Sequence, residues 1–221
     1  MNPEELDPIL QVMGNTVRRK IIKRLSQEPC YALQLSKELG LGQPLVAKHL
    51  GVMEGAGLVM SSTETSPSGP NRKRYSLARS VSITMDLAPN LFIERGVAFE
   101  AKPAKARASK EAGSFDRRIN EVMETPDARE RLSILSDILD GIDRRMGEVE
   151  EERMELLDVR DRAMREASKI AGRLDELDKR RVLFHILDEH DTEVESISES
   201  LNLRELTVKA ILQELERDYF S

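Results

Sequence analysis

The sequence predicts a mainly α-helical protein with one small β element. Three observations lead to this prediction: apolar residues recur at helical spacing between residues 16 and 58, a 3-4 apolar repeat runs from Leu132 to Leu177, and the pattern of the first segment returns 162 positions later. Aromatic residues make up 4% of the chain, Trp is absent and 33% of the residues are charged. This composition favours long solvated helices over one thick globule.

The segment from Thr16 to Leu58 has the apolar spacing and the turn signals of three short packed helices. Asn15 can cap the first helix, TVRRKIIKRL, through its side-chain oxygen. The second helix is expected over roughly 31–39, and Gly40 supplies the left-handed residue that ends it. Pro44 fits the first turn of the third helix, where its missing N–H costs nothing. The residues expected on the inner face of this third helix are Val46, Leu50 and Met53.

Two segments rich in β-branched and apolar residues, LVMSSTET and KRYSLA, follow the third helix. They flank SPSGPNR, a stretch with two Pro and one Gly, and therefore predict a hairpin. We expect Arg72, Lys73 and Arg74 to lie on the protruding loop of this hairpin. Three helices followed by a hairpin predict a winged helix-turn-helix domain over residues 1–80.

The middle of the chain is expected to be extended at first and then helical. In residues 81–115, one or two short strands or an extended crossing are followed by a small, polar, basic linker. A coiled-coil-like helical region is expected over 116–177, because its apolar repeat forms a seam that needs a partner helix. A continuous helix would span roughly 70 Å, but three Gly residues leave two shorter helices folded on each other as an alternative. We favour a homodimer that forms through this region over an intramolecular hairpin.

Residues 178–221 repeat the apolar pattern of the first domain without a gap. Matching pairs include Leu35 with Ile197, Val46 with Val208, and Leu50 with Leu212. Any three-helix domain needs a similar apolar set, so the safer interpretation is a shared tri-helical shape. The charge is reversed, since residues 175–221 hold six basic against thirteen acidic residues. DNA contact is therefore not expected for this helix-turn-helix-like domain, and a protein-facing, ligand-facing or purely structural role is left open.

Charge is distributed unevenly along the 221 residues. The formal net charge is -6, yet residues 8–80 carry +7 and residues 81–221 carry -10. A basic module on an acidic body is what a phosphate-contacting head would require. The chain has no apolar run long enough to span a membrane, and its single cysteine, Cys30, fits a reducing compartment. We therefore expect a cytoplasmic protein without a membrane partner.

The strongest candidates for double-stranded DNA binding lie at the start of the third helix, which in a helix-turn-helix faces base edges in the major groove. Gln can pair with adenine, Lys or His can contact guanine or phosphate, and small apolar side chains can touch a thymine methyl. The outward positions are Gln43, Pro44, Leu45, Ala47, Lys48 and His49. Arg72, Lys73 and Arg74 suit a wing that contacts the DNA backbone or minor groove, with a solvated turn as the alternative. Arg18 and Arg19 are expected to contact phosphate or to pair with Glu residues.

Metal and enzyme chemistry are not predicted. His185 and His190 lie near Asp188 and Asp191, but residues five apart share a helix face poorly, and one Cys with three His cannot easily build a closed metal site. No Gly-rich phosphate loop, nucleophile elbow or paired His and carboxylate motif is present. We expect no cofactor and no catalytic residues.

Several motifs resemble archaeal, sulfur-responsive winged-helix regulators of the ArsR superfamily. They are GNTVRR, VAKHL, MEGAGLV and GPNRKRY in the first domain, and the similarity continues through LAPNLF to about Gly96. The resemblance implies a homodimer that binds a palindromic promoter element. Such a relative carries a Cys-x-x-Cys thiol switch where this chain has Gln27-Glu28-Pro29-Cys30, so an intramolecular disulfide cannot form here. Cys30 is left as a possible thiol sensor or, more simply, an inert core residue.

These observations favour a sequence-specific transcriptional regulator. Its expected protein partners are a second copy of the chain and the transcription machinery, and a redox or stress signal is one option for its regulation. Two alternatives stay open. One is an architectural, nucleoid-type protein that binds DNA broadly. The other is an interaction adaptor whose helix-turn-helix no longer touches DNA.

Overall fold

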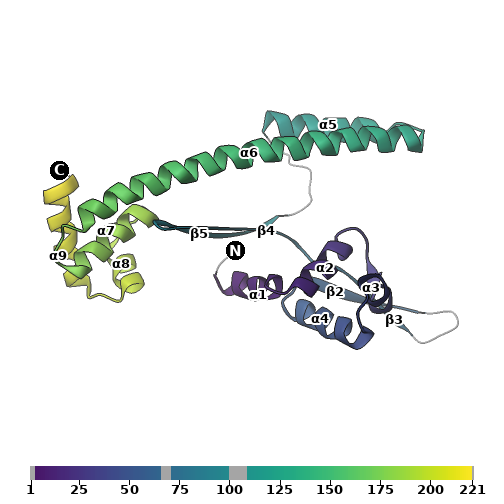
Figure 1. Ribbon diagram of the computed structural model, residues 1–221, viewed down its shortest axis with the longest axis horizontal. Helices are drawn as coiled ribbons and strands as arrows, with labels where there is room; N and C mark the ends of the chain where they lie inside the picture. Colours follow the sequence, from purple (N-terminus) through teal and green to yellow (C-terminus); the bar gives the residue numbers. More distant parts are fainter. Residues whose placement is uncertain (1–2, 66–70, 100–108, 221) are drawn as a thin grey trace. The chain divides into compact units, whose positions relative to one another are not determined.

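The computed structural model describes residues 3–65, 71–99 and 109–220 (Figure 1). Its elements form two compact units, which we call the head and the helical body; the body begins at Arg117 and also includes Leu87–Phe92. In chain order the elements before the longest helix are α1 (Pro3–Met13), α2 (Thr16–Leu25), β1 (Cys30–Tyr31), α3 (Ala32–Leu39), α4 (Gln43–Gly55), β2 (Val59–Glu64), β3 (Arg72–Leu77), β4 (Ser80–Ala88), β5 (Leu91–Phe99) and α5 (Lys110–Met123). They are followed by α6 (Ala128–Ala171), α7 (Leu177–Glu189), α8 (Val194–Leu201), α9 (Glu205–Leu215) and a π-helical turn (Glu216–Phe220).

The three helices predicted in the head are confirmed as α2, α3 and α4. The Asn15 side chain accepts hydrogen bonds from the backbone N–H groups of Val17 at 3.0 Å and Arg18 at 3.1 Å, as a capping residue does. Gly40 ends α3 with a φ of 64°. The inner face of α4 is buried as predicted, and with neighbouring helices it forms one core that includes Ile21, Leu25, Leu35, Val46, Leu50 and Met53.

Helix α1 was not expected from the sequence. Its apolar residues Leu6, Ile9 and Val12 are buried, and the last two belong to the core of the head. Pro8 lies inside this helix. Proline is unfavourable inside a helix because it lacks the N–H that would donate to a backbone carbonyl. The helix forms because its buried side chains pack against the rest of the head.

The wing is a three-stranded antiparallel sheet with strand order β1-β3-β2. Val59 lies opposite Leu77 and Glu64 opposite Arg72, whereas Cys30 lies opposite Tyr75 on the other side of β3. The expectation that Arg72, Lys73 and Arg74 lie on a loop is therefore wrong, because all three belong to strand β3. Residues 66–70 of the expected loop lie outside the described residues.

The segment expected to be strands or an extended crossing forms the paired strands β4 and β5. Their connecting turn, which belongs to the helical body, contacts Asp161 of α6, a residue that is only 8% exposed. The Asp161 carboxylate accepts the backbone N–H of Asn90 at 3.2 Å and a guanidinium N–H of Arg165 at 2.5 Å. The ion pair with Arg165, together with the Asn90 hydrogen bonds, holds the pKa of Asp161 below its usual value. These contacts satisfy a carboxylate that would otherwise be costly to bury.

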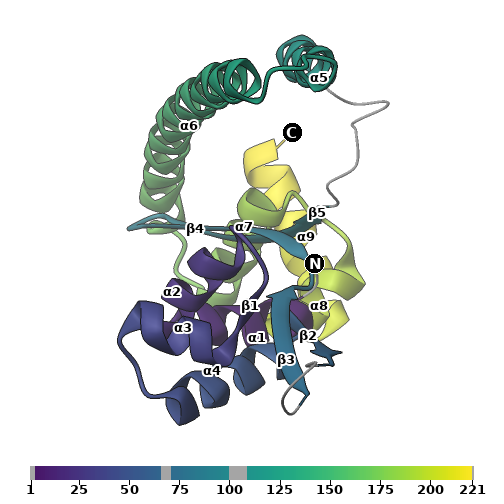
Figure 2. The same ribbon diagram turned by 90° about the vertical axis from the view of Figure 1, so that its right-hand side faces the viewer.

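Helix α6 is one uninterrupted helix of 44 residues, about 66 Å long at 1.5 Å per residue. The alternative of two shorter helices in its place is thus excluded, although Gly172 does end the helix before α7 begins. In both views α5 lies beside the amino-terminal part of α6 (Figures 1 and 2). Val122 of α5 and Ile138 of α6 are buried.

The carboxy-terminal helices repeat helix boundaries and turn geometry of the head. Helix α8 spans the residues of α3 shifted by 162, and α9 begins at the residue that corresponds to the start of α4. The Ser36 hydroxyl donates to the carbonyl of Leu41 at 2.5 Å, and the corresponding Ser198 hydroxyl donates to Leu203 at 2.6 Å. Asn202 adopts a φ of 53° where the head has Gly40. The predicted tri-helical shape is confirmed.

Two glycines in the head should respond to alanine with opposite signs. We expect Gly40→Ala to lower the free energy of unfolding by about 1–2 kcal/mol, because an L-residue is strained in the left-handed conformation. Gly51→Ala should raise it by about 1 kcal/mol, because Gly51 lies inside α4 with open space around the added methyl group. Urea unfolding monitored by circular dichroism measures both changes. Equal effects of the two substitutions would contradict the assigned backbone conformations.

Candidate nucleic-acid interface

The core of the head determines which side chains α4 presents to solvent. Val46, Leu50 and Met53 are buried, so the opposite side of the helix faces outward. The outward, exposed side chains near the start of α4 are Gln43, Pro44, Leu45, Ala47 and Lys48. Gly42 precedes the helix without a side-chain cap, so the first N–H groups of α4 gain no cap from that residue.

His49 differs from its neighbours on α4 because it is half-buried. Burial, followed by the nearby positive charges of Arg18 and Lys48, lowers the pKa of its imidazole below the usual value. The ring is therefore neutral at pH 7 and can offer one donor and one acceptor, but no charge.

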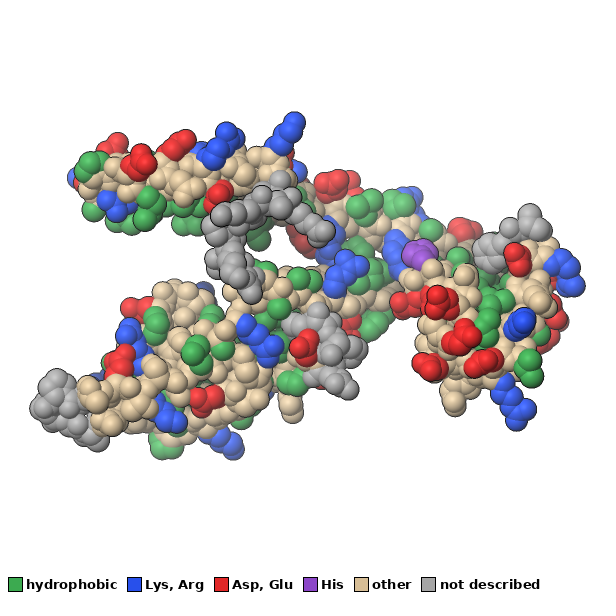
Figure 3. Space-filling model, turned by 180° about the vertical axis from the view of Figure 1, so that it is seen from behind, with side chains coloured by type: hydrophobic (Ala, Val, Ile, Leu, Met, Phe, Trp, Pro, Cys, Tyr) green, Lys and Arg blue, Asp and Glu red, His purple; other side chains and the backbone are tan. Residues whose placement is uncertain are grey.

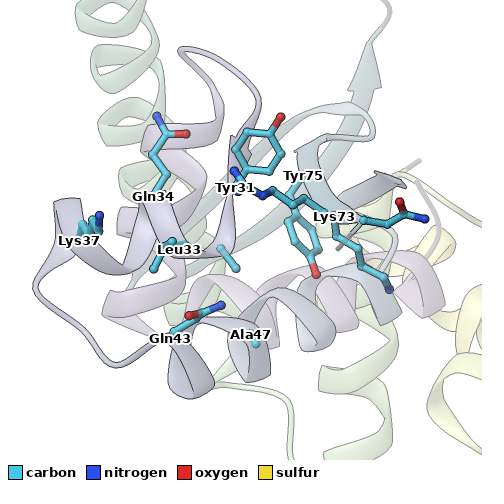
Figure 4. Close-up of a pocket in the computed structure, with 11 residues that line it drawn as sticks. Tyr31, Leu33, Gln34, Lys37, Gln43, Ala47, Lys73 and Tyr75 are labelled. Atoms are coloured by element: carbon cyan, nitrogen blue, oxygen red, sulfur yellow. The ribbon is translucent and has the colours of Figure 1, made fainter. Parts of the chain in front are cut away.

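A groove borders the start of α4. It has a volume of about 670 Å³ and lies between α3, α4 and the wing strand β3. Its apolar surface comes from residues such as Leu33, Ala47 and Tyr75, and its polar surface includes Gln34, Lys37, Gln43, Arg72 and Lys73. Figure 4 shows Gln43 and Ala47 on α4, Gln34 and Lys37 on α3, and Lys73 reaching from the wing. Amide and cationic groups thus line one concave surface.

Arg74 was expected to contact DNA, but its side chain holds the wing together. Its guanidinium donates to the Glu64 carboxylate at 3.2 Å, and the hydroxyl of Tyr31 donates to the other oxygen of the same carboxylate. The hydrogen bond from Tyr31, and then that from Arg74, lowers the pKa of Glu64, while the same contact raises the pKa of Tyr31. Three strands are therefore joined at Glu64 by charge-assisted hydrogen bonds.

The guanidinium groups of Arg18 and Arg19 bind backbone carbonyls rather than Glu carboxylates. Arg18 donates to the carbonyls of Val12 at 2.8 Å and Gln11 at 2.5 Å, and Arg19 donates to Met13 at 2.5 Å. These carbonyls lie at the end of α1, where a helix leaves acceptors unsatisfied. Both arginines therefore cap α1.

Sequence reasoning missed Arg79. Its guanidinium donates to the carbonyls of Gly57 at 3.1 Å and Ala56 at 2.9 Å, just past the end of α4. Gly57 has a φ of 67°, and a Cβ there would come within 3.0 Å of this guanidinium. No local sequence signal links Arg79 to residues more than twenty positions earlier.

The cations of the head are divided by type. Five arginines bind groups within the head: Arg18, Arg19 and Arg79 bind carbonyls, Arg24 pairs with Glu28 and Glu38, and Arg74 pairs with Glu64. In the described part of the head, the lysines form no ion pair with a carboxylate; they are Lys20, Lys23, Lys37, Lys48, Lys73 and Lys110. The charge available to an external anion is therefore carried by lysines and by Arg72 and Arg95.

Cys30 lies in the core of the head with no exposed surface. Its thiol donates to the carbonyl of Glu28 at 3.4 Å, and burial raises its pKa. A thiol in this state is a poor nucleophile, because the thiolate is the reactive form. The geometry favours the core role over the sensor role that the sequence also left open.

The face of the carboxy-terminal domain that corresponds to the groove carries the opposite charge. Subtracting 162 matches Leu33, Lys37 and Gln43 with Glu195, Glu199 and Glu205, which are all exposed. Figure 3 shows acidic side chains gathered over the carboxy-terminal helices. Phosphate would be repelled from this surface.

The described residues contain no group of three or more His, Cys, Asp or Glu side chains that could hold a metal ion. Nor does any helix within these residues combine the length and the apolar composition needed to cross a membrane.

The tri-helical packing, the exposed side of α4 and the adjoining sheet define the head as a winged helix-turn-helix. Residues 15–61 match the model of a family described as bacterial regulatory protein, arsR family. The head therefore contains an ArsR-family helix-turn-helix domain, which indicates a DNA-binding transcriptional regulator. The match covers α2 to the start of β2 and leaves out the helical body.

Solved structures similar to this chain include two from bacteria. Reduced HlyU from Vibrio cholerae N16961 is 25% identical, with a TM-score of 0.31, over 34% of this chain and 74% of that chain. The cadmium metal-sensor CMTR from Mycobacterium tuberculosis is 31% identical, with a TM-score of 0.29, over 34% of this chain and 72% of that chain. No curated protein matches the chain.

The burial of Cys30 predicts a protected thiol. We expect 5,5'-dithiobis(2-nitrobenzoate) to label the native protein at least about 100-fold more slowly than the protein unfolded in guanidinium chloride, because labelling needs exposure of the thiolate. The absorbance of the released thiol measures both rates, and Cys30→Ser is the blank. Labelling of the native protein within seconds would restore Cys30 as a sensor.

Proposed function

We propose that this protein is a sequence-specific, DNA-binding transcriptional regulator that acts as a homodimer on a palindromic promoter element. The groove beside the start of α4 is the observation that carries the proposal. It is bordered by amide and cationic side chains from α3, α4 and β3, and it adjoins the helix that reads bases in other helix-turn-helix domains. Because DNA is the partner, we assign the protein to the cytoplasm.

The proposed contacts fall into two kinds. Gln43, Ala47 and Lys48 contact base edges, with Pro44 and Leu45 adding apolar contact and neutral His49 at the margin. Arg72 and Lys73 bind phosphate from the wing. Arg18, Arg19 and Arg74 are left out of direct contact, because their guanidinium groups bind carbonyl or carboxylate groups of the head.

An exposed apolar stripe on the helical body supports the homodimer. Large apolar side chains remain exposed on α6 in two series with seven-residue spacing. The first series is Leu132, Leu139 and Met146, and the second is Val149, Leu156 and, fourteen residues later, Ile170. Seven-residue spacing is the signature of a helix that packs lengthwise against another helix. A homodimer pairs two identical heads, which suits a palindrome whose half-sites lie about 34 Å apart.

The redox signal is not part of this proposal, because the thiol of Cys30 is buried. No described site in the head identifies the signal that the regulator would sense. Nor does any described site there indicate a contact with the transcription machinery. The acidic face of the carboxy-terminal domain favours a protein or ligand partner over DNA for that domain.

The DNA contacts can be tested on duplexes selected from a random pool by the full-length protein. We expect Lys48→Ala to weaken binding roughly tenfold or more and to relax sequence preference. The double substitution of Arg72 and Lys73 by Ala should reduce the slope of log affinity against log salt by about 2, as two lost phosphate contacts require. Fluorescence anisotropy between 50 and 300 mM salt measures both effects.

Lys209→Ala is the matched control, because it removes the same charge from α9 in the acidic domain and should change neither quantity. If the parent bound no duplex at all, the adaptor role would replace DNA binding, and if all variants bound DNA like the parent, the proposed contact residues would be wrong. If the selected duplex bound no better than random DNA, the architectural role would replace sequence-specific regulation.

The dimer can be tested separately. We expect Leu139→Glu and Leu156→Glu each to weaken dimerisation about 100-fold or more, because each change removes a leucine from the interface in both copies at roughly 1.5–3 kcal/mol each. Analytical ultracentrifugation over a concentration series measures the dissociation constant. Leu206→Glu is the control, since Leu206 is 82% exposed on α9 and lies outside the stripe. A dimer that tolerates both α6 substitutions would show that the exposed apolar stripe is not the dimer interface.

A further inference from the structure

The head contains a second cavity that shares no residue with the groove beside α4. It has a volume of about 440 Å³ and is lined mainly by aliphatic and aromatic side chains. The apolar wall includes Ile9 and Met13 of α1, Ile22 of α2, Val81 and Ile83 of β4, and Phe99 of β5. Its charged and hydroxyl groups come from Arg79 and Ser80.

The apolar wall is incompletely covered within the head. Met13, Ile22, Val81 and Ile83 are only half-buried, and Phe99 is 55% exposed. Covering such a surface with an apolar group of a ligand is favourable by about 25 cal/mol per Å² of buried area. A volume of this size, apolar walls and a few polar groups are the usual properties of a small-molecule site.

Arg79 gives the cavity its charge. Its Nε and Nη2 donate to the carbonyls of Gly57 and Ala56, which holds the guanidinium in place. Within the part of the chain that the structure describes, no carboxylate forms an ion pair with this side chain. A guanidinium without an anionic partner beside an apolar cavity favours a ligand that carries an acid group.

We propose that this cavity binds a small amphipathic anion, such as a medium-chain carboxylate, with its hydrocarbon part against α1 and β4 and its acid group at Arg79. The site is independent of the groove proposed for DNA. Arg79 also holds the carbonyls that follow α4, so an occupant would contact a residue that caps the end of the proposed recognition helix.

The charge requirement is tested with two probes of equal chain length, octanoate and 1-octanol, titrated by calorimetry into the full-length protein without DNA. We expect one octanoate per chain. Arg79→Gln should weaken octanoate binding about tenfold or more, because a charge-assisted hydrogen bond is lost, and should leave octanol binding unchanged. Arg95→Gln, on β5 but outside the cavity wall, is the matched control and should change neither.

The position of the site is tested by its walls. Val81→Phe should weaken both probes because the ring fills the cavity, and Phe99→Ala should weaken both because apolar wall is lost. Circular dichroism verifies folding, and the exposed position of Phe99 keeps the test available if Val81→Phe does not fold. Equal binding of octanoate to the parent and Arg79→Gln, unchanged binding to both wall variants, or no saturable binding would each overturn the proposal. The readout uses no DNA, so its failure is distinguishable from failure of the proposed function.

Discussion

Burial of one side of α4 against the core of the head determines what that helix can present to a partner. Val46, Leu50 and Met53 have no exposed surface, and they share a core with Ile21 and Leu35. A rotation of α4 about its axis would bring Lys48 into that core without a counter-ion, which costs far more than a surface contact returns. The register of apolar residues in the sequence therefore decides the composition of the outer face. Gln43, Ala47 and Lys48 are available to a nucleic acid because the core occupies the opposite side of the helix.

Signals that act within a few residues made much of the fold predictable. The capping oxygen of Asn15, left-handed Gly40 and the first-turn Pro44 each act on an adjacent helix end, and the 3-4 repeat predicted the long α6. The prediction failed where partners are distant in sequence. Arg79 meets Ala56 and Gly57 only after β3 has folded back, and Arg74 meets Glu64 only across two paired strands. A run of basic residues looks the same in sequence whether its members face solvent or cap a helix, so the roles of Arg18, Arg19 and Arg74 could not be separated without coordinates.

The two tri-helical units separate scaffold from surface. Their turns share the same hydroxyl-to-carbonyl hydrogen bond, from Ser36 in one and Ser198 in the other. The residues that support this geometry are apolar or small in both units, whereas the outward residues differ in charge. One backbone thus presents lysine and glutamine in the head and glutamate in the carboxy-terminal domain. The same shape can serve two kinds of partner because the core does not constrain the exposed positions.

The division of cations in the head has a chemical consequence. The guanidinium groups that bind carbonyls and carboxylates within the head keep their charge at every physiological pH. The charge that faces outward belongs, apart from Arg72 and Arg95, to primary amines. Acylation of an amine removes its charge and leaves the guanidinium groups untouched. Covalent modification of lysine could therefore neutralise most of the outer positive surface while the framework beneath it stayed intact.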